Sequence, residues 1–170
     1  MTTLVRSGCG LVPADKTSGF TLIELILVLA VLGVLATIAT PIAQVTVQRS
    51  KENELRLALR EIRSALDAHK RAFDDGRIVR TVDATGFPAT LEVLVAGVEN
   101  ARDPKKSRMY FLRRIPRDPM ADDSDGPAEN TWGIRSYDSE PTDPKEGKDV
   151  FDVYSRSTRF GLNGVAYKKW

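Results

Sequence analysis

The sequence predicts an α+β fold in which one long N-terminal helix packs against a small antiparallel β-sheet. Two observations support this prediction. An apolar run is followed by a helical pattern that contains no proline from Gln44 to Phe73. Several short strand candidates and one Asn-Gly turn then fill the C-terminal half. A helix followed by a group of short strands is typical of α+β domains, and 170 residues suffice for one such domain.

Charge and cysteine content exclude some classes of protein. The net charge is +2, from 25 basic and 23 acidic residues, so the overall charge gives no argument for a nucleic-acid partner. The single cysteine, Cys9, excludes an intramolecular disulfide. Charged residues are almost absent from Ser18 to Gln48 and dense afterwards, which indicates that the two parts of the chain meet different solvents.

The apolar run extends from Phe20 to Gln48, and Glu24 is its only charged residue. Its most apolar part, Leu22 to Ala39, would rise about 27 Å as a helix, close to the hydrocarbon thickness of a bilayer. Two interpretations are a cleaved secretory signal, with a weak small-residue site at Thr37-Ile38-Ala39, and an uncleaved anchor for an ordinary globular domain.

A third interpretation comes from the junction Gly19-Phe20-Thr21-Leu22-Ile23-Glu24, which resembles the type IV prepilin signature. The resemblance implies that a prepilin peptidase removes residues 1–19 by cutting between Gly19 and Phe20, and then methylates the new amine of Phe20. Glu24 matches the acidic residue that the family carries shortly after the cut. Pro41 matches a proline common in the family's helix.

Glu24 needs a physical explanation, because a carboxylate at the centre of a bilayer costs about 2.5–3.5 kcal/mol on insertion scales. Glu24 lies near one end of the run, where the cost is smaller. The resemblance implies that the Phe20 amine of a neighbouring subunit pairs with it in a filament, which would set the axial register of assembly. The alternative is an acid that snorkels to the membrane interface.

The charges that flank the run conflict with the orientation that the resemblance implies. Arg6 and Lys16 precede the run, whereas five basic residues follow it closely: Arg49, Lys51, Arg56, Arg60 and Arg63. The positive-inside rule would keep the large domain in the cytoplasm. We give more weight to the specific junction motif, and therefore expect a single-pass inner-membrane protein with a periplasmic C-terminal domain.

The helical pattern continues beyond the apolar run. One face carries Leu55, Leu59, Ile62, Leu66 and Phe73, with His69 in the gap. The opposite face carries Lys51, Glu52, Glu54, Arg56, Arg60, Glu61, Arg63 and Asp67. We expect a nearly continuous helix from Phe20 to Asp75 that stops at Asp74-Asp75-Gly76 and is kinked or locally melted at Pro41. His69 is expected to be a partly exposed helical residue rather than a ligand.

These patterns divide the chain into a leader (1–19), a transmembrane and filament-core helix (20–48), its amphipathic continuation (49–76) and a globular domain (77–170). In that domain, Phe87 to Val95 predicts a turn and a short helix, with apolar positions Leu91, Leu94, Val95 and Val98 on one face. Strands are predicted at Met109–Leu112, Thr131–Tyr137 and Asp149–Ser155. Asn163-Gly164 predicts a hairpin between 160–162 and 165–167.

The C-terminal half carries a second resemblance. The segments "FLRRIPRDPM", "WGIRSY" and "DVFDVYS", with the terminal tryptophan, are similar to the major, G-type pseudopilins of type II secretion systems. That resemblance implies a pilin-like fold and a structural role, without catalysis, in a short periplasmic filament for protein export. The implied partners are further copies of the chain, prepilin peptidase, other pseudopilins and the inner-membrane secretion machinery.

The resemblance also raises the question of calcium, which many of these pseudopilins bind in an acidic loop after the "DxxS" strand. Here that loop, Arg156 to Gly161, is basic, so the usual site is expected to be absent. Calcium prefers six to eight oxygen ligands, usually with several carboxylates. Asp122, Asp123 and Asp125, next to Gly126, are weak calcium candidates, and a solvated loop is the favoured interpretation. Apart from these candidates, no cofactor is expected.

Three other functions compete with the pseudopilin. A type IV pilus subunit, major or minor, would share the junction, but adhesive pilins usually carry a C-terminal disulfide, and no cysteine follows Cys9. A membrane-anchored periplasmic binding domain or enzyme lacks support, because the sequence shows no nucleophile–base pair and no metal-ligand cluster. A DNA-uptake filament would need a basic patch from Arg108, Arg113, Arg114, Arg117, Lys168 and Lys169; we expect no nucleic-acid partner.

Overall fold

The structure is a computed structural model that describes residues 19–122 and 126–170, apart from the side chains of residues 38–42. The chain divides into two compact units, Met1–Ala43 and Gln44–Trp170. Helix α1 (Leu22–Asp74) contributes to both units. Except for Gly19, the predicted leader lies outside the described residues.

The long helix was predicted correctly to within two residues at each end. α1 continues through Pro41, so the helix is not melted there. A kink at Pro41 stays a prediction, because its side chain lies outside the described residues. In the part of the chain that the structure describes, no helix is both long and apolar enough to cross a membrane.

Within the second unit, α1 buries one face. The buried positions recur every three or four residues, as expected for one side of a helix: Glu52, Leu55, Ala58, Leu59, Ile62, Ala65, Leu66, His69 and Ala72. The helix ends where predicted. Gly76 has a φ of 69°, and Arg77 N donates to Ala72 O at 2.9 Å, which is the Schellman arrangement of hydrogen bonds.

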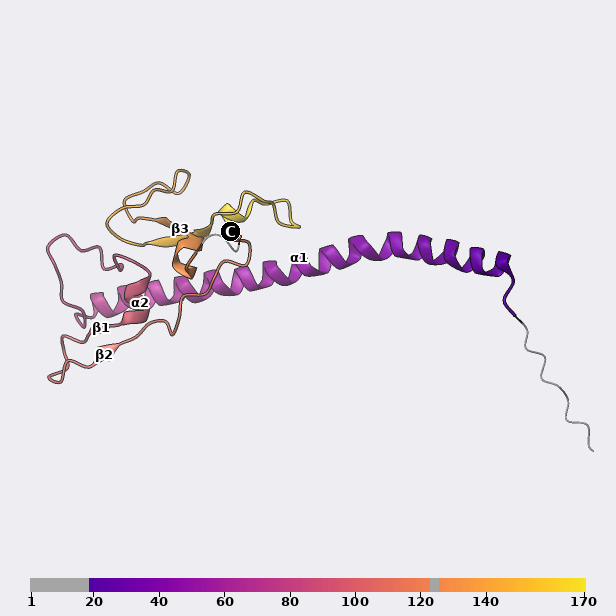
Figure 1. Ribbon diagram of the computed structural model, residues 1–170. Coiled ribbons are helices and arrows are strands. Elements are labelled where there is room, and N and C mark those ends of the chain that lie inside the picture. The colour runs from indigo at the N-terminus through magenta and orange to yellow at the C-terminus, as the bar shows by residue number, and fades with distance from the viewer. Residues whose placement is uncertain (1–18, 123–125) are drawn as a thin grey trace, which may run out of the picture. The chain divides into compact units, whose positions relative to one another are not determined.

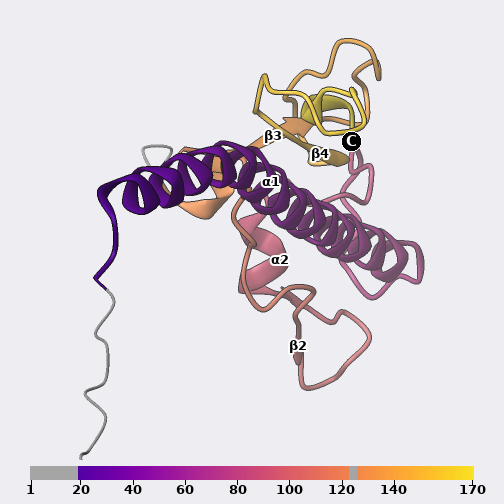
Figure 2. The same ribbon diagram turned by 90° about the vertical axis from the view of Figure 1, so that its right-hand side faces the viewer.

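Two small antiparallel sheets flank this part of α1, on opposite sides (Figures 1 and 2). On one side lie α2 (Glu92–Ala96), β1 (Val98–Glu99) and β2 (Arg108–Met109). On the other lie η2 (Ala128–Thr131), β3 (Trp132–Arg135), β4 (Asp152–Ser155) and η3 (Tyr167–Lys169). β1 pairs with β2, and β3 pairs with β4 in a register that places Trp132 opposite Ser155.

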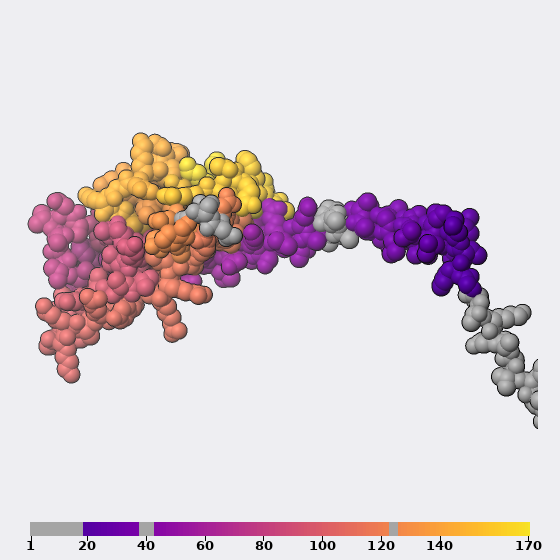
Figure 3. Space-filling view, in the orientation of Figure 1, coloured from indigo at the N-terminus to yellow at the C-terminus, as the bar shows by residue number. Residues whose placement is uncertain are grey.

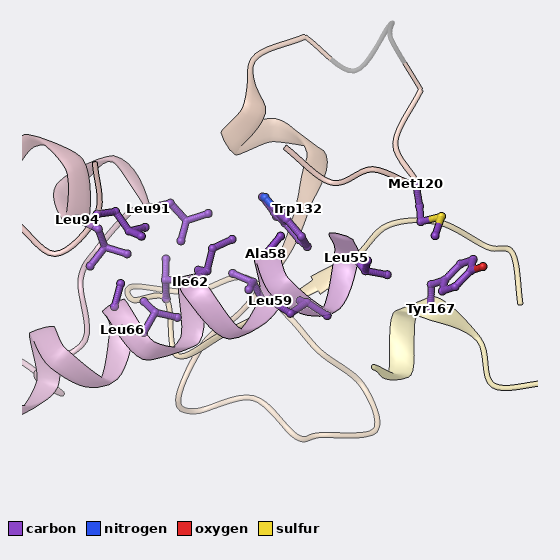
Figure 4. Packing of buried hydrophobic residues seen from close by; sticks show 14 residues of the cluster. Leu55, Ala58, Leu59, Ile62, Leu66, Leu91, Leu94, Met120, Trp132 and Tyr167 are labelled. Atoms are coloured by element: carbon purple, nitrogen blue, oxygen red, sulfur yellow. The ribbon is translucent and has the colours of Figure 1, made fainter. Parts of the chain in front are cut away.

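The hydrophobic core lies between α1 and these elements. Figure 4 shows Leu55, Ile62 and Leu66 of α1 among Trp132, Leu91 and Leu94, with Tyr167 and Met120 near one end. Trp132 is fully buried, and its indole Nε1 donates to Pro116 O at 2.8 Å. On the face seen in Figure 3, residues that follow α1 in the sequence, coloured pink to yellow, cover much of the second unit's helix.

Several predicted elements of the globular domain are shorter than expected. The single predicted sheet is two separate two-stranded sheets. α2 ends at Gly97, whose φ of 75° is outside the helical range, so Val98 lies in β1 rather than on the helix. The predicted Asn163-Gly164 hairpin is reduced to one bridge, Phe160 to Ala166, because the chain turns into η3 immediately afterwards.

Truncation of a core residue tests this packing. Ile62→Ala should lower the free energy of unfolding by about 2–5 kcal/mol, because Ile62 is fully buried and the cavity cannot fully collapse. Leu57→Ala is the matched control, since Leu57 is 60% exposed on the same helix, and it should change stability by less than about 0.5 kcal/mol. Urea unfolding in detergent, followed by tryptophan fluorescence, measures both. Equal losses would contradict the assigned core face.

Candidate processing and assembly site

The predicted cleavage junction is accessible. Gly19 and Phe20 are exposed and precede the first turn of α1, and the Phe20 side chain is 84% exposed. No atom lies within 4 Å of the position that a Cβ on Gly19 would take. Gly19 and Phe20 thus lie outside the helix and are exposed, while cleavage between them stays a prediction.

Thr21 and Glu24 form the start of α1. The backbone N–H of Glu24 donates to Thr21 Oγ1 at 3.3 Å, so Thr21 is the N-cap and Glu24 the third helical residue. Ser/Thr-x-x-Glu is the capping-box pattern. The sequence interpretation assigned Glu24 an assembly role only and missed this local one, although the motif could have revealed it. An acid in the first turn also interacts favourably with the helix dipole.

The apolar segment that contains Glu24 presents side chains on every side. Each described side chain from Gly19 to Thr37 is exposed. The large apolar residues that are about half exposed or more are Leu22, Ile23, Leu25, Ile26, Leu27, Val28, Leu29, Val31, Leu32, Val34 and Leu35. A contiguous apolar surface of this kind marks a site of contact with lipid or with other proteins.

Glu52 differs from its prediction. The sequence placed it on the solvated face, but Glu52 is 5% exposed and forms a cluster that joins α1 to the C-terminal segment. Its Oε1 accepts hydrogen bonds from Tyr167 Oη at 2.9 Å, Leu162 N at 2.8 Å and Gln48 Nε2 at 3.2 Å. Burial, together with the neighbouring Glu52 carboxylate, raises the pKa of Tyr167 and keeps the hydroxyl protonated as a donor.

Arg63 makes a second connection between α1 and the C-terminal segment. Its guanidinium pairs with Asp152 Oδ1 at 2.8 Å and donates to the carbonyl oxygens of Val153 and Trp170 at 3.1 and 2.9 Å. The guanidinium of Arg56 lies 4.5 Å from the centre of the Trp170 ring. Residues from both segments line a shallow groove: Arg56, Leu59, Arg60, Arg63, Asn163, Val165, Lys169 and Trp170.

The basic residues weighed for DNA binding do not gather in one patch. Arg108 lies in β2, on one side of α1, whereas Lys168 and Lys169 lie near the C-terminus on the other side (Figures 1 and 2). Arg113 and Arg114 line a groove next to α2, and Arg114 also lies beside Glu54 and Glu61 in another groove. These positions provide no continuous basic surface.

His69 is buried, so the expectation of a partly exposed side chain was wrong. It is 5% exposed, its Nδ1 donates to Gly86 O at 2.9 Å, and its ring lies edge-on to Phe111 with centroids 5.2 Å apart. Burial lowers its pKa, against the opposing effect of the hydrogen bond to Gly86. A glycine is needed at position 86, where φ is 90° and a Cβ would lie 2.7 Å from the Phe73 ring.

Of the three calcium candidates, the structure describes only Asp122. Asp122 is exposed, Asp123 and Asp125 lie outside the described residues, and the loop after β4 contributes Arg156 and Arg159. Calcium sites need several carboxylates or carbonyl oxygens directed at one point. Across the described ranges, no three His, Cys, Asp or Glu side chains gather as a metal site.

Comparison with known proteins agrees with both resemblances that were inferred from the sequence. Residues 15–40 match the model described as the prokaryotic N-terminal methylation motif. The chain is 30% identical to type II secretion system core protein G of Pseudomonas aeruginosa over 136 residues, which are 78% of this chain and 88% of that protein. The chain belongs to the type II secretion system core protein G family. The resemblance inferred from the sequence is confirmed.

Other members of the core protein G family match less of the chain. The Klebsiella michiganensis protein is 27% identical over 109 residues, 62% of this chain and 69% of that protein. The Escherichia coli protein is 26% identical over 113 residues, 64% of this chain and 70% of that protein. No solved structure gives a significant match.

The lowered pKa of His69 predicts a pH dependence of stability. Because the folded pKa lies below the unfolded value of 6.5, the unfolded chain binds the proton more readily between these two values. The free energy of unfolding should therefore fall as the pH drops below about 6.5. His69→Gln cannot titrate and should remove this part of the slope. Urea unfolding of the wild type and of His69→Gln between about pH 5 and pH 8 measures this dependence. If the free energy of unfolding changes with pH to the same extent in both, His69 is not its source.

The Glu52 cluster predicts a second stability effect. Glu52→Ala leaves Tyr167 Oη and Leu162 N without their acceptor, so it should lower the free energy of unfolding by about 1–3 kcal/mol. Glu54→Ala is the control, because Glu54 is exposed two positions away on the same helix. Urea unfolding measures the free energy of unfolding of both variants. If Glu52→Ala loses no more stability than Glu54→Ala, the proposed role of the cluster is refuted.

Proposed function

We propose that the chain is a structural subunit of a type II secretion pseudopilus. A prepilin peptidase cuts it between Gly19 and Phe20 and methylates the new amine. The mature chain then joins a short periplasmic filament that takes part in protein export. The observation that carries this proposal is the exposed Gly19–Glu24 junction, followed by an exposed apolar helix, in a member of the core protein G family.

The exposed apolar helix supports storage in the inner membrane followed by assembly. Moving one large aliphatic side chain out of water is worth about 1.5–3 kcal/mol, so a row of such residues is strongly driven into lipid. Only a surface of equal apolar character can replace that lipid. The same segment of other copies provides such a surface, and lateral packing of residues 20–48 would hold the filament together.

Glu24 and the Phe20 amine supply the register of assembly. The new N-terminus of a mature chain carries a positive charge, and the Glu24 carboxylate of a neighbour is a matching anion. Within the apolar interior of a filament, an unpaired carboxylate is strongly unfavourable, whereas a paired one is tolerated. Subunits displaced along the axis would leave Glu24 unpaired, so the pair favours a single register. The capping geometry between Thr21 and Glu24 is compatible with this role, since it uses the backbone N–H of Glu24 and leaves its carboxylate for pairing.

The proposed location is the inner membrane, crossed once by residues 20–48, with the globular domain in the periplasm. Membership of the core protein G family supports this location. Partners are further copies of the chain, prepilin peptidase, other pseudopilins and the secretion machinery. We include no catalytic step, and this is supported by the single histidine, which is buried in the core.

Intact mass and N-terminal sequencing test the processing step. The chain is isolated from membranes that contain prepilin peptidase, and the product should begin at N-methyl-Phe20. A chain that begins at Met1 or Thr40 would contradict the proposal and support an uncleaved anchor or a secreted domain instead.

The two roles of Glu24 can be separated by substitution. Glu24→Gln keeps a capping-box residue at the third helical position but removes the charge. Processing should therefore continue. Filament yield should fall at least about tenfold, as expected for the loss of more than about 1.4 kcal/mol per subunit contact. Thr21→Val removes the cap and keeps the charge, so it should assemble. Filaments sheared from cells with the full secretion system are quantified by immunoblot. Normal assembly of processed Glu24→Gln would rule out the charge pair.

A further inference from the structure

The loop from Phe160 to Val165 exposes a group of apolar side chains. Phe160 is 64% exposed, Leu162 45% and Val165 41%. Trp170 lies next to them, half-buried, and its Nε1 donates to Val165 O at 3.3 Å. Single apolar residues on a surface need no explanation, but a group of them marks a site of contact. This loop is therefore a candidate contact surface.

Hydrogen bonds hold the loop beside α1. Gln48 Nε2 donates to Phe160 O at 3.4 Å and to Tyr167 Oη at 3.0 Å. Leu162 N donates to Glu52 Oε1 at 2.8 Å. The yellow C-terminal segment accordingly lies along α1 in Figure 1. Phe160 and Leu162 are thus level with Gln48, the last residue of the apolar run.

Under the proposed function, on which this inference rests, residues 20–48 cross the inner membrane. These 29 residues would rise about 43 Å as a helix. A bilayer with its headgroup regions is about 40–45 Å thick. Gln48 then lies at the headgroups of the periplasmic leaflet, and the loop beside it lies at the same depth.

The backbone of the loop is already hydrogen-bonded within itself. Gly161 N donates to Val165 O at 2.9 Å, and Gly164 N donates to Gly161 O at 2.9 Å. Val165 N donates to Asn163 Oδ1 at 3.0 Å. Moving a backbone group out of water is costly only when it lacks a partner. The turn can therefore approach lipid at a low cost in lost hydrogen bonds.

The charges next to the loop are positive. Arg49 directly follows Gln48, Lys51 directly precedes Glu52, and both are exposed. Lys169 is exposed and lines a groove together with Val165. Glu52 itself is buried and accepts hydrogen bonds from the loop and from Tyr167. Apolar side chains next to exposed cations are typical of surfaces that bind membranes with anionic lipids.

We propose that the loop is a second membrane contact of the subunit. Phe160 and Leu162 enter the headgroup region of the periplasmic leaflet beside α1, and the neighbouring cations bind its anionic lipids. Phe and Leu are typical of the apolar side of interfacial segments. The contact fixes the globular domain on the lipid surface while the subunit awaits assembly, and entry into the filament breaks it.

Quenching of a fluorescent probe by lipid tests the proposal. The mature chain has no cysteine, so Phe160→Cys carries a single environment-sensitive fluorophore. The labelled chain is placed in vesicles of phosphatidylethanolamine and phosphatidylglycerol, some of whose lipids carry a nitroxide near the headgroup. Emission should fall at least about twofold, because interfacial side chains lie about 5–10 Å into this boundary. The same emission with and without nitroxide would overturn the proposal.

Tyr110→Cys is the matched control. Tyr110 is 65% exposed, close to the value for Phe160, but its neighbour Phe111 packs against His69. His69 lies 21 residues beyond Gln48 on α1 (69 − 48), or about 32 Å along the helix. A probe at position 110 should therefore remain unquenched. Equal quenching at positions 110 and 160 would overturn the proposal, because the contact would not be specific to the loop.

Val28→Cys separates failure of this inference from failure of the proposed function. Val28 lies inside the apolar run, so nitroxides in the acyl chains should quench a probe there. Quenching at position 28 without quenching at 160 would overturn the loop contact and leave the proposed span intact. No quenching at either position would overturn both. A probe at 160 that is shielded from water but unquenched by lipid would indicate a second copy as the occupant, and would also overturn the proposal.

Substitutions test which groups make the contact. With the probe at Leu162→Cys, the added changes Phe160→Ser and Val165→Ser should reduce quenching at least about twofold, because the apolar area that enters the lipid is lost. Tyr110→Ser should leave quenching unchanged. Thermal unfolding checks that each variant is folded. Equal quenching before and after the paired serine changes would overturn the proposal. Vesicles of phosphatidylcholine alone should give weaker quenching, and equal quenching there would overturn the role of the cations.

Discussion

The packing of one face of α1 against α2 and the β3–β4 sheet is the interaction on which the Gln44–Trp170 unit depends. Neither two-stranded sheet is stable alone, because such ribbons are marginal in water. The face of α1 from Leu55 to Leu66 forms one buried cluster with Leu94 of α2 and Trp132 of β3. Buried carboxylates then replace long strands as the means of fixing the loops. Glu52 accepts a hydrogen bond from Leu162 N in the C-terminal turn. Asp149 accepts hydrogen bonds from Thr85, Ser136 and Tyr137. Burial alone would raise the pKa of Asp149, but these hydrogen bonds outweigh it and lower the pKa.

The sequence of α1 changes character along its length. From Leu22 to Thr37 every side chain is exposed and Glu24 is the only charged residue, so under the proposed function lipid or other copies cover this part. After Gln44 the helix is amphipathic and finds its partner in its own domain. A subunit of this kind can be folded and inserted before it is assembled, since folding uses one half of the helix and leaves the other half free. The Thr21 cap lets the helix begin directly after the predicted cut.

The sequence was sufficient for the parts of the fold that depend on local patterns. The helix, its Gly76 stop and the strands β3 and β4 follow from periodicity and turn residues. It was not sufficient where distant segments decide the outcome. Glu52 and His69 lie at the helical spacing of the buried face, but their polar side chains led to the expectation of exposure. They are buried because Leu162, Tyr167, Gly86 and Phe111 cover them from far along the chain. The Thr21–Glu24 cap was predictable, but the prepilin motif drew attention to another role of the same residue.

The most direct test of the account is whether the apolar half of α1 is covered by other copies of itself. Cys9 precedes the predicted cut, so the mature chain has no thiol, and single cysteines at positions 26, 29 or 32 would be its only ones. Mild oxidation of cells that contain the secretion system should produce disulfide-linked dimers when two of these variants are expressed together, and Val82→Cys, on the exposed surface of the globular domain, serves as the control. The account predicts dimers that require both the system and the charge at Glu24. Processed chains that are exported into filaments without any cross-link in this segment would contradict it.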